Sequence, residues 1–169
     1  MKGLKLMFLI ILIANLIFGV TACGKKKEEA QKVQTVASSS LPEEGFKVMI
    51  STENPPTSLK INSPANIIKI KVKNTSSVVW PSKSQPDGKY AIHLAYHWLD
   101  MGDKFVVGDG LRTLLPHDIR PNEEVNLDAA VAAPNSEGEY ILEWDMVQEG
   151  VAWFKDRGGK TSRIPMKIE

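Results

Sequence analysis

Apolar and polar residues alternate along most of the chain after residue 45. Residues 68–72 alternate isoleucine or valine with lysine, and residues 125–131 alternate apolar side chains with polar or small ones. Successive side chains of a β-strand point to opposite faces, so this alternation predicts strands with one buried face. The same pattern predicts further strands over residues 46–50, 90–99, 140–147, 151–154 and 164–168.

These segments are interrupted about every eight to fifteen residues by the turn-forming residues Pro, Gly, Asn and Asp. This spacing is typical of an antiparallel all-β domain. The pair Pro55-Pro56 excludes a helix, and Asn122 suits a turn because Asn tolerates positive φ better than most residues. No segment shows a convincing amphipathic helical period. The sequence therefore predicts one domain over residues 44–169, an immunoglobulin-like antiparallel β-sandwich of seven to eight strands.

Two aromatic residues occupy positions that are typical of immunoglobulin-like sandwiches. Trp98 lies in a long central strand, where such folds place a core Trp, and Tyr140 lies two residues after Gly138, where they place a tyrosine corner. The disulfide of antibody domains is excluded because Cys23 is the single cysteine of the chain.

The N-terminal segment has the pattern of a secretory signal. Lys2 and Lys5 precede an apolar run over residues 6–18, which is shorter than the roughly 20 residues of a membrane-spanning helix. The run ends in Val-Thr-Ala followed by Cys23, and this sequence resembles the lipobox of bacterial lipoproteins. The resemblance implies a signal peptide over residues 1–22, cleavage before Cys23 and lipidation of that cysteine. The alternative is an ordinary signal peptide that happens to carry a cysteine.

Residues 23–43 contain few large apolar side chains and are rich in Lys, Glu, Gln, Ala and Ser. Such a segment buries too little surface to offset its ordering entropy, so we expect a lipidated Cys23 followed by a flexible tether. Lys25 to Lys27 either touch anionic headgroups or belong to a solvated linker. Because Gly24 replaces the aspartate that commonly retains enteric lipoproteins in the inner membrane, a Gram-negative host implies the outer membrane. In any other host we expect the outer face of the cytoplasmic membrane.

The charge balance is near neutral, with 21 Lys and Arg against 20 Asp and Glu. Nucleic acid is therefore not expected as a partner, because phosphate binding needs clustered cations. The chain has no Gly-x-Ser-x-Gly elbow and no phosphate-binding glycine loop before a helix. We therefore expect neither enzyme activity nor a cofactor.

A metal site is not expected either. On a strand, His93 and His97 are about 13 Å apart, which no single ion bridges. Oxygen-rich loops can bind calcium, but the spacing of an EF-hand is missing here, and turn capping is the alternative role of the loop aspartates. These aspartates are Asp100, Asp103, Asp109 and Asp118.

Three segments go beyond generic strand patterning: Tyr-His-Trp-Leu-Asp at residues 96–100, Asp-Gly-Leu-Arg-Thr-Leu-Leu-Pro at 109–116 and Val-Gln-Glu-Gly-Val-Ala-Trp-Phe at 147–154. In this order they resemble a module that is appended to glycosyltransferases and methyltransferases of bacterial cell-surface polysaccharide. The resemblance implies a non-catalytic, immunoglobulin-like accessory domain that contacts glycan or protein. This chain departs from the fused examples because it carries the module alone behind a lipid anchor.

Polar and aromatic residues of these motifs are the candidate ligand contacts. A guanidinium has five hydrogen-bond donors in a rigid planar group, so it can bind several acceptors at once. Arg112 therefore either borders a binding site or holds its own loop in place by bonding to Asp109 or Glu149. Trp153 and Phe154 are adjacent, so on a strand one of them should be exposed as a sugar platform, unless both are packing residues. The predicted ligand-binding residues are His97, Arg112, Gln148, Glu149, Trp153 and Phe154.

The sequence thus predicts a lipid-anchored cell-envelope binding protein. The first hypothesis is a glycan-contacting accessory module of the envelope polysaccharide machinery. The alternative is a structural or assembly lipoprotein that recruits a protein partner through its edge strands or an apolar patch.

Overall fold

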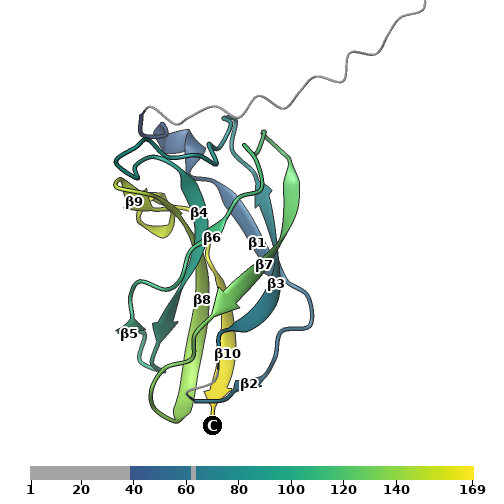
Figure 1. The fold of residues 1–169 in the computed structure, drawn as a ribbon, viewed down its shortest axis with the longest axis vertical. Helices are drawn as coiled ribbons and strands as arrows, with labels where there is room; N and C mark the ends of the chain where they lie inside the picture. The colour runs from purple at the N-terminus through teal and green to yellow at the C-terminus, as the bar shows by residue number, and fades with distance from the viewer. Residues whose placement is uncertain (1–38, 62–63) are drawn as a thin grey trace, which may run out of the picture. The chain divides into compact units, whose positions relative to one another are not determined.

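The computed structural model describes residues 39–61 and 64–169, which fold into two β-sheets packed face to face (Figure 1). The predicted signal peptide, Cys23 and most of the predicted tether lie outside the described residues. In chain order the elements are η1 (Glu43–Gly45), β1 (Val48–Thr52), β2 (Ser58–Leu59), β3 (Asn66–Asn74), β4 (Ile92–Leu99), β5 (Phe105–Val107), β6 (Thr113–Leu114), β7 (Glu124–Val131), β8 (Gly138–Gln148), β9 (Ala152–Trp153), η2 (Lys155–Arg157) and β10 (Ser162–Ile168).

One sheet has three strands in the order β1–β3–β7, and both pairs are antiparallel. The other has seven strands in the order β2–β10–β8–β4–β5, with β6 paired to β4 and β9 paired to β8. Only the short β2–β10 pair is parallel among the strand pairs of the described residues. The predicted all-β sandwich is therefore confirmed.

The described residues form ten strands, more than the seven to eight predicted. The additional strands β2, β5 and β6 contain two or three residues each. An alternating pattern needs about four residues to be recognised, so strands of this length give no signal in the sequence.

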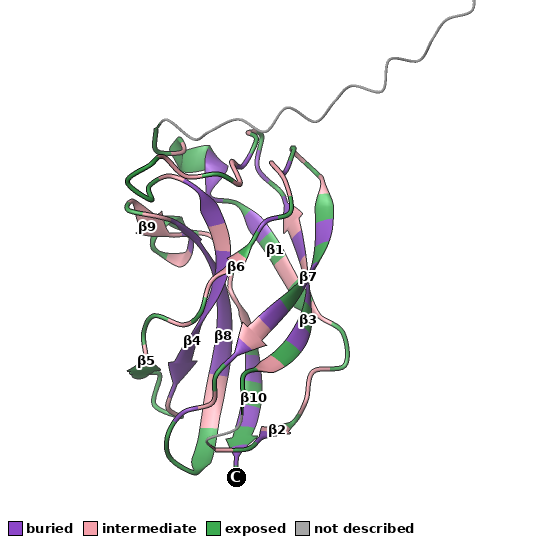
Figure 2. Cartoon of the chain, in the orientation of Figure 1, coloured by how far each residue is buried: buried purple, intermediate pink, exposed green. Residues whose placement is uncertain are grey.

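The core lies between the two sheets, as the alternation requires. On β3, Ile68, Ile70 and Val72 are buried, while the lysine side of the strand faces outward (Figure 2). The largest fully buried side chains come from the other sheet and its connecting loops, and their removal from water stabilises the domain. They include Trp80, Tyr96, Trp98 and Trp144.

The two immunoglobulin-like aromatic positions are occupied as predicted. Trp98 is fully buried, and its Nε1 donates a hydrogen bond of 2.8 Å to the Ala132 carbonyl. The Tyr140 hydroxyl donates to the carbonyl of Ser136 at 3.1 Å, the upstream backbone bond that defines a tyrosine corner. Asn122 adopts a φ of 64°, which confirms the predicted turn.

Strand β4 differs from its prediction in two ways. It begins at Ile92 and not at Tyr90, because Tyr90 has a φ of 73° and donates its N–H to the Glu149 carbonyl. Its outer face was expected to be the less buried one, yet His97 on that face is 1% exposed. The side chains of Trp153 on β9 and Phe105 on β5 explain this burial, since their rings lie 4.2 and 5.2 Å from the His97 ring.

The folded contacts begin before residue 44, the predicted start of the domain. The fully buried Gln148 side chain accepts the Leu41 N–H at 2.9 Å and donates to the Ser39 carbonyl at 3.1 Å. This one amide therefore fixes the chain where it enters the sandwich. Within the described ranges, no helix has the length and hydropathy of a membrane span.

Candidate functional site

The three motifs meet on the outer face of β4. His93 and His97 point to this face because they alternate with the core residues of the strand. The pairing of β4 with β8 sets Val147 opposite His93, and β9 then sets Trp153 opposite Val147. We define the outer-face cluster as His93, His97, Arg112, Glu149 and Trp153.

Arg112 holds this cluster together. Its Nε donates to Glu149 Oε1 at 2.7 Å, and one terminal nitrogen donates to the Gly110 carbonyl at 2.8 Å and to the Asp109 carboxylate. The guanidinium also lies 5.0 Å from the centre of the Trp153 ring, a cation–π contact. Of the two roles left open by the sequence, these contacts are those of a clamp on the loop of residues 109–116.

Glu149 is the acidic centre of the cluster. Its Oε1 accepts the bond from Arg112 and lies 2.9 Å from His93 Nδ1. Burial acts to raise the pKa of Glu149, but the hydrogen bonds from Arg112 and His93 oppose it and bring the pKa below its usual range. Glu149 is therefore a carboxylate at neutral pH, and its charge is already balanced by Arg112.

His97 is a buried member of the cluster and has no face open to a ligand. Its ring lies 4.2 Å from the Trp153 ring, and its Nδ1 lies 2.7 Å from the Gly108 carbonyl. Its Nε2 makes no hydrogen bond within the described residues and lies 3.8 Å from an oxygen of the fully buried Asp145. His97, which was predicted to contact a ligand, is a packing residue in this structure, because the Trp153 and Phe105 rings cover it.

Gln148 and Phe154, two other predicted contacts, lie outside the cluster. Gln148 is used by the entry segment, as described above. Phe154 is fully buried, in edge contacts with Phe46 at 5.0 Å and Trp80 at 5.2 Å. Strand β9 ends at Trp153, and Phe154 has the helical φ and ψ of the residue that precedes η2. The alternation assumed from a continuous strand therefore does not apply to Phe154.

The apolar side chains that border the cluster were not predicted. Phe105 is 56% exposed and Leu114 is 66% exposed, and Leu111 is also exposed in the loop that leads to β6. Opposed residues of paired strands share a face, so the pairs Phe105–Leu99 and His93–Leu114 place both side chains on the outer face of β4. Their strands are too short for the alternating pattern to reveal this position.

The loop aspartates act in turns and ion pairs. Asp100 accepts the N–H groups of Gly102 and Lys104 at 2.8 and 3.0 Å, and Asp118 accepts the Ser82 N–H at 2.9 Å. Within residues 39–61 and 64–169, no group of three or more His, Cys, Asp or Glu side chains is placed to hold a metal ion.

Comparison with protein-family models and with curated protein sequences gives no match. Among solved structures, a CARDB domain from Pyrococcus furiosus matches 72% of this chain and 92% of its own, with 15% identity and a TM-score of 0.41. The sporulation control protein Spo0M from Bacillus subtilis matches 73% of this chain and 49% of its own, with 16% identity and a TM-score of 0.42. A Niemann-Pick type C2 protein from Japanese carpenter ant matches 73% and 89%, with 12% identity and a TM-score of 0.38. At such identities the similarity concerns the fold alone.

Proposed function

We propose that this protein is a lipid-anchored cell-envelope protein that recruits a partner protein through the outer face of β4. The observation that carries the proposal is the exposure of Phe105 and Leu114 on the same face as the paired Arg112 and Trp153. Aromatic and Arg side chains dominate the energetic centres of protein interfaces, and apolar neighbours exclude water around them. The proposed role has no catalytic step.

The hydrogen bonds inside the cluster favour a protein partner over a sugar. Glu149 accepts from Arg112, and Arg112 is also engaged with Asp109 and Gly110. A sugar hydroxyl has to replace these internal bonds, whereas a protein partner gains from covering exposed apolar surface without breaking them. The outer face is thus better suited to apolar contact than to dense hydrogen bonding.

The membrane part of the proposal depends on the N-terminal sequence. A lipid on Cys23, after the lipobox-like Val-Thr-Ala, anchors the chain and leaves the sandwich at the end of a tether. The proposed location is the outer membrane of a Gram-negative host or the outer face of the cytoplasmic membrane in any other.

The test uses the full lipidated chain in detergent, immobilised and exposed to solubilised envelope proteins of its own organism. Leu114→Glu places a charge on the outer face, and Ile67→Glu, at a similarly exposed apolar residue of β3, is the matched control. We expect one protein to be retained by the wild type and by Ile67→Glu, and lost with Leu114→Glu. Equal retention by both variants contradicts the proposal.

Glycan contact is the second candidate, and one observation favours it. Trp153 keeps intermediate exposure beside the Arg112 guanidinium, while Trp80, Trp98 and Trp144 are fully buried. A soluble fluorescence quencher therefore reports mainly on Trp153. If envelope polysaccharide binds here, it will protect this fluorescence from acrylamide, and unchanged quenching at saturating polysaccharide excludes glycan contact at Trp153.

A further inference from the structure

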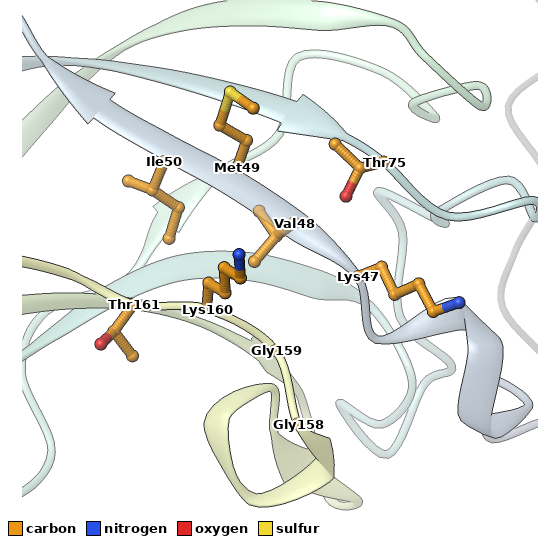
Figure 3. Close-up of a pocket in the computed structure, with 9 residues that line it drawn as sticks. All are labelled: Lys47, Val48, Met49, Ile50, Thr75, Gly158, Gly159, Lys160 and Thr161. Atoms are coloured by element: carbon orange, nitrogen blue, oxygen red, sulfur yellow. The ribbon is translucent and has the colours of Figure 1, made fainter.

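A groove runs along the open edge of β1 (Figure 3), and none of its lining residues belongs to the outer-face cluster. Its volume is about 470 Å³, and it separates β1 from the segment of residues 158–161 that leads into β10. Figure 3 shows Lys160 reaching from that segment toward β1, while Met49 points to the opposite side of the strand. The lining residues are Lys47, Val48, Met49, Ile50, Thr75, Gly158, Gly159, Lys160 and Thr161.

Strand β1 presents unpaired backbone groups to this groove. Among the described strands it pairs with β3 alone. The Thr75 N–H donates to the Lys47 carbonyl at 3.1 Å, so Lys47 and Thr75 form a hydrogen-bonded pair of the antiparallel ladder. Because such pairs alternate, the N–H and C=O groups of Val48 and Ile50 point away from β3 toward the open edge. No backbone group of residues 39–61 or 64–169 bonds to them there.

The groove is also positively charged. Lys47 and Lys160 are both exposed at its border, and its lining contains no carboxylate. Within the described part of the chain, neither amino group lies within ion-pair distance of an acidic side chain. The two charges are therefore free to attract an anionic partner.

The facing strand is protected from pairing, whereas β1 is not. On β10, Pro165 lacks an N–H group, and β2 covers the backbone at Lys167 and Ile168. Proline and short covering strands are common devices that prevent unwanted strand addition. The five residues of β1, Val-Met-Ile-Ser-Thr, include no proline and are mostly β-branched.

We propose that this groove binds an extended, acidic segment of a partner protein, which adds to the open edge of β1 as a further strand. The backbone groups of Val48 and Ile50 supply the ladder hydrogen bonds, and Lys47 and Lys160 select glutamate or aspartate in the incoming segment. This site is separate from the outer face of β4, so it does not depend on the function proposed above.

The test measures binding of a labelled nine-residue peptide that alternates valine with glutamate to the full chain in detergent, with hydrogen exchange of the backbone amides. The Lys47→Glu/Lys160→Glu double variant reverses both groove charges, and Lys83→Glu, at an exposed lysine outside the lining, is the matched charge control. Ile50→Pro removes one open-edge donor without removing a bond to β3.

We expect the peptide to bind and to slow exchange at Val48 and Ile50. The double charge reversal should weaken binding about tenfold or more, while Lys83→Glu changes it by less than about twofold. Ile50→Pro should abolish the slowing of amide exchange by the peptide. If this proline unfolds the domain, the double charge variant still tests the proposal. The proposal is overturned if the peptide does not bind at millimolar concentration. It is also overturned if the peptide slows amide exchange only in β5, or if Lys83→Glu weakens peptide binding as much as the double variant does. Leu114→Glu should leave peptide binding unchanged, which separates this result from that for the outer face.

Discussion

Arg112 Nε donates a hydrogen bond of 2.7 Å to Glu149 Oε1, and the two residues are 37 positions apart in the chain. The bond joins the loop that precedes β6 to the residue that follows β8. Two of the three sequence motifs are thereby tied directly to each other, and the third, on β4, packs against Trp153 through His97. The motifs therefore form one physical unit.

The first prediction concerns the strength of this bond. Arg112→Ala leaves Glu149 partly buried without its cationic partner, so the free energy of unfolding should fall by about 1–3 kcal/mol. Urea denaturation of the full chain measures the loss. Arg120→Ala, at an exposed arginine with no side-chain bond in the described structure, is the control and should change stability by less than about 0.5 kcal/mol. If Arg112→Ala is as stable as the control, the guanidinium does not act as a clamp.

The second prediction concerns the pH dependence of the stability that Glu149 contributes. Because the pKa of Glu149 is lower in the folded than in the unfolded chain, its carboxylate stabilises the fold above the unfolded value of about 4.3. That contribution should be lost as the pH falls through the folded-state pKa. The free energies of unfolding of wild type and Glu149→Gln should therefore become more similar as the pH falls from about 7 to about 3, as measured by denaturation at each pH. A difference between wild type and Glu149→Gln that stays constant over this pH range contradicts the role assigned to Glu149.

The third prediction concerns the glycine in the Asp-Gly-Leu-Arg motif. Gly110 donates its N–H to the Tyr96 carbonyl at 2.9 Å, and a β-carbon at this position would lie 2.5 Å from that carbonyl oxygen. Gly110→Ala should therefore displace the loop from β4 and lower stability by about 1–3 kcal/mol. The matched variant is Gly108→Ala, whose β-carbon meets Phe105 at an ordinary 3.8 Å and should have little effect. Equal melting temperatures for the two variants contradict the close approach.

The fourth prediction concerns the membrane anchor. Cys23→Ala removes the thiol that the lipobox-like sequence predicts to be lipidated. Cells fed a labelled fatty acid should incorporate the label into wild type and not into the variant, and the wild type alone should partition into the detergent phase. Release of an unlabelled wild-type protein from the membrane would identify residues 1–22 as an ordinary signal peptide instead.

The strand pattern of the sandwich could be predicted because each long strand has one buried face. The alternating apolar residues at 68–72 and 125–131 are a direct consequence of that burial. A shift of the strand register by one residue would expose them to solvent. Trp98 was predictable for the same reason, since it lies on the buried face of β4. Tyr140 and Asn122 were predictable because each depends on a local backbone geometry.

The candidate site was predicted only in part. Sequence reasoning placed Arg112 near Asp109 or Glu149, and the structure shows bonds to both. It did not predict that Gln148 and Phe154 are both fully buried, because a polar or aromatic residue type does not reveal what covers it. Nor did it reveal the exposed Phe105 and Leu114, whose strands are defined by their pairing with β4 and not by a repeating pattern.

The sequence by itself determined the all-β class, the long strands, the turns that separate them and the lipobox-like segment before Cys23. These features are local, because they depend on the period of burial and on the backbone preferences of single residues. Only the tertiary structure decided that His97, Arg112 and Trp153 meet, that His97 is buried under its neighbours and that the edge of β1 is open. These features depend on which distant strands pair and in what register, and no short stretch of sequence specifies that pairing.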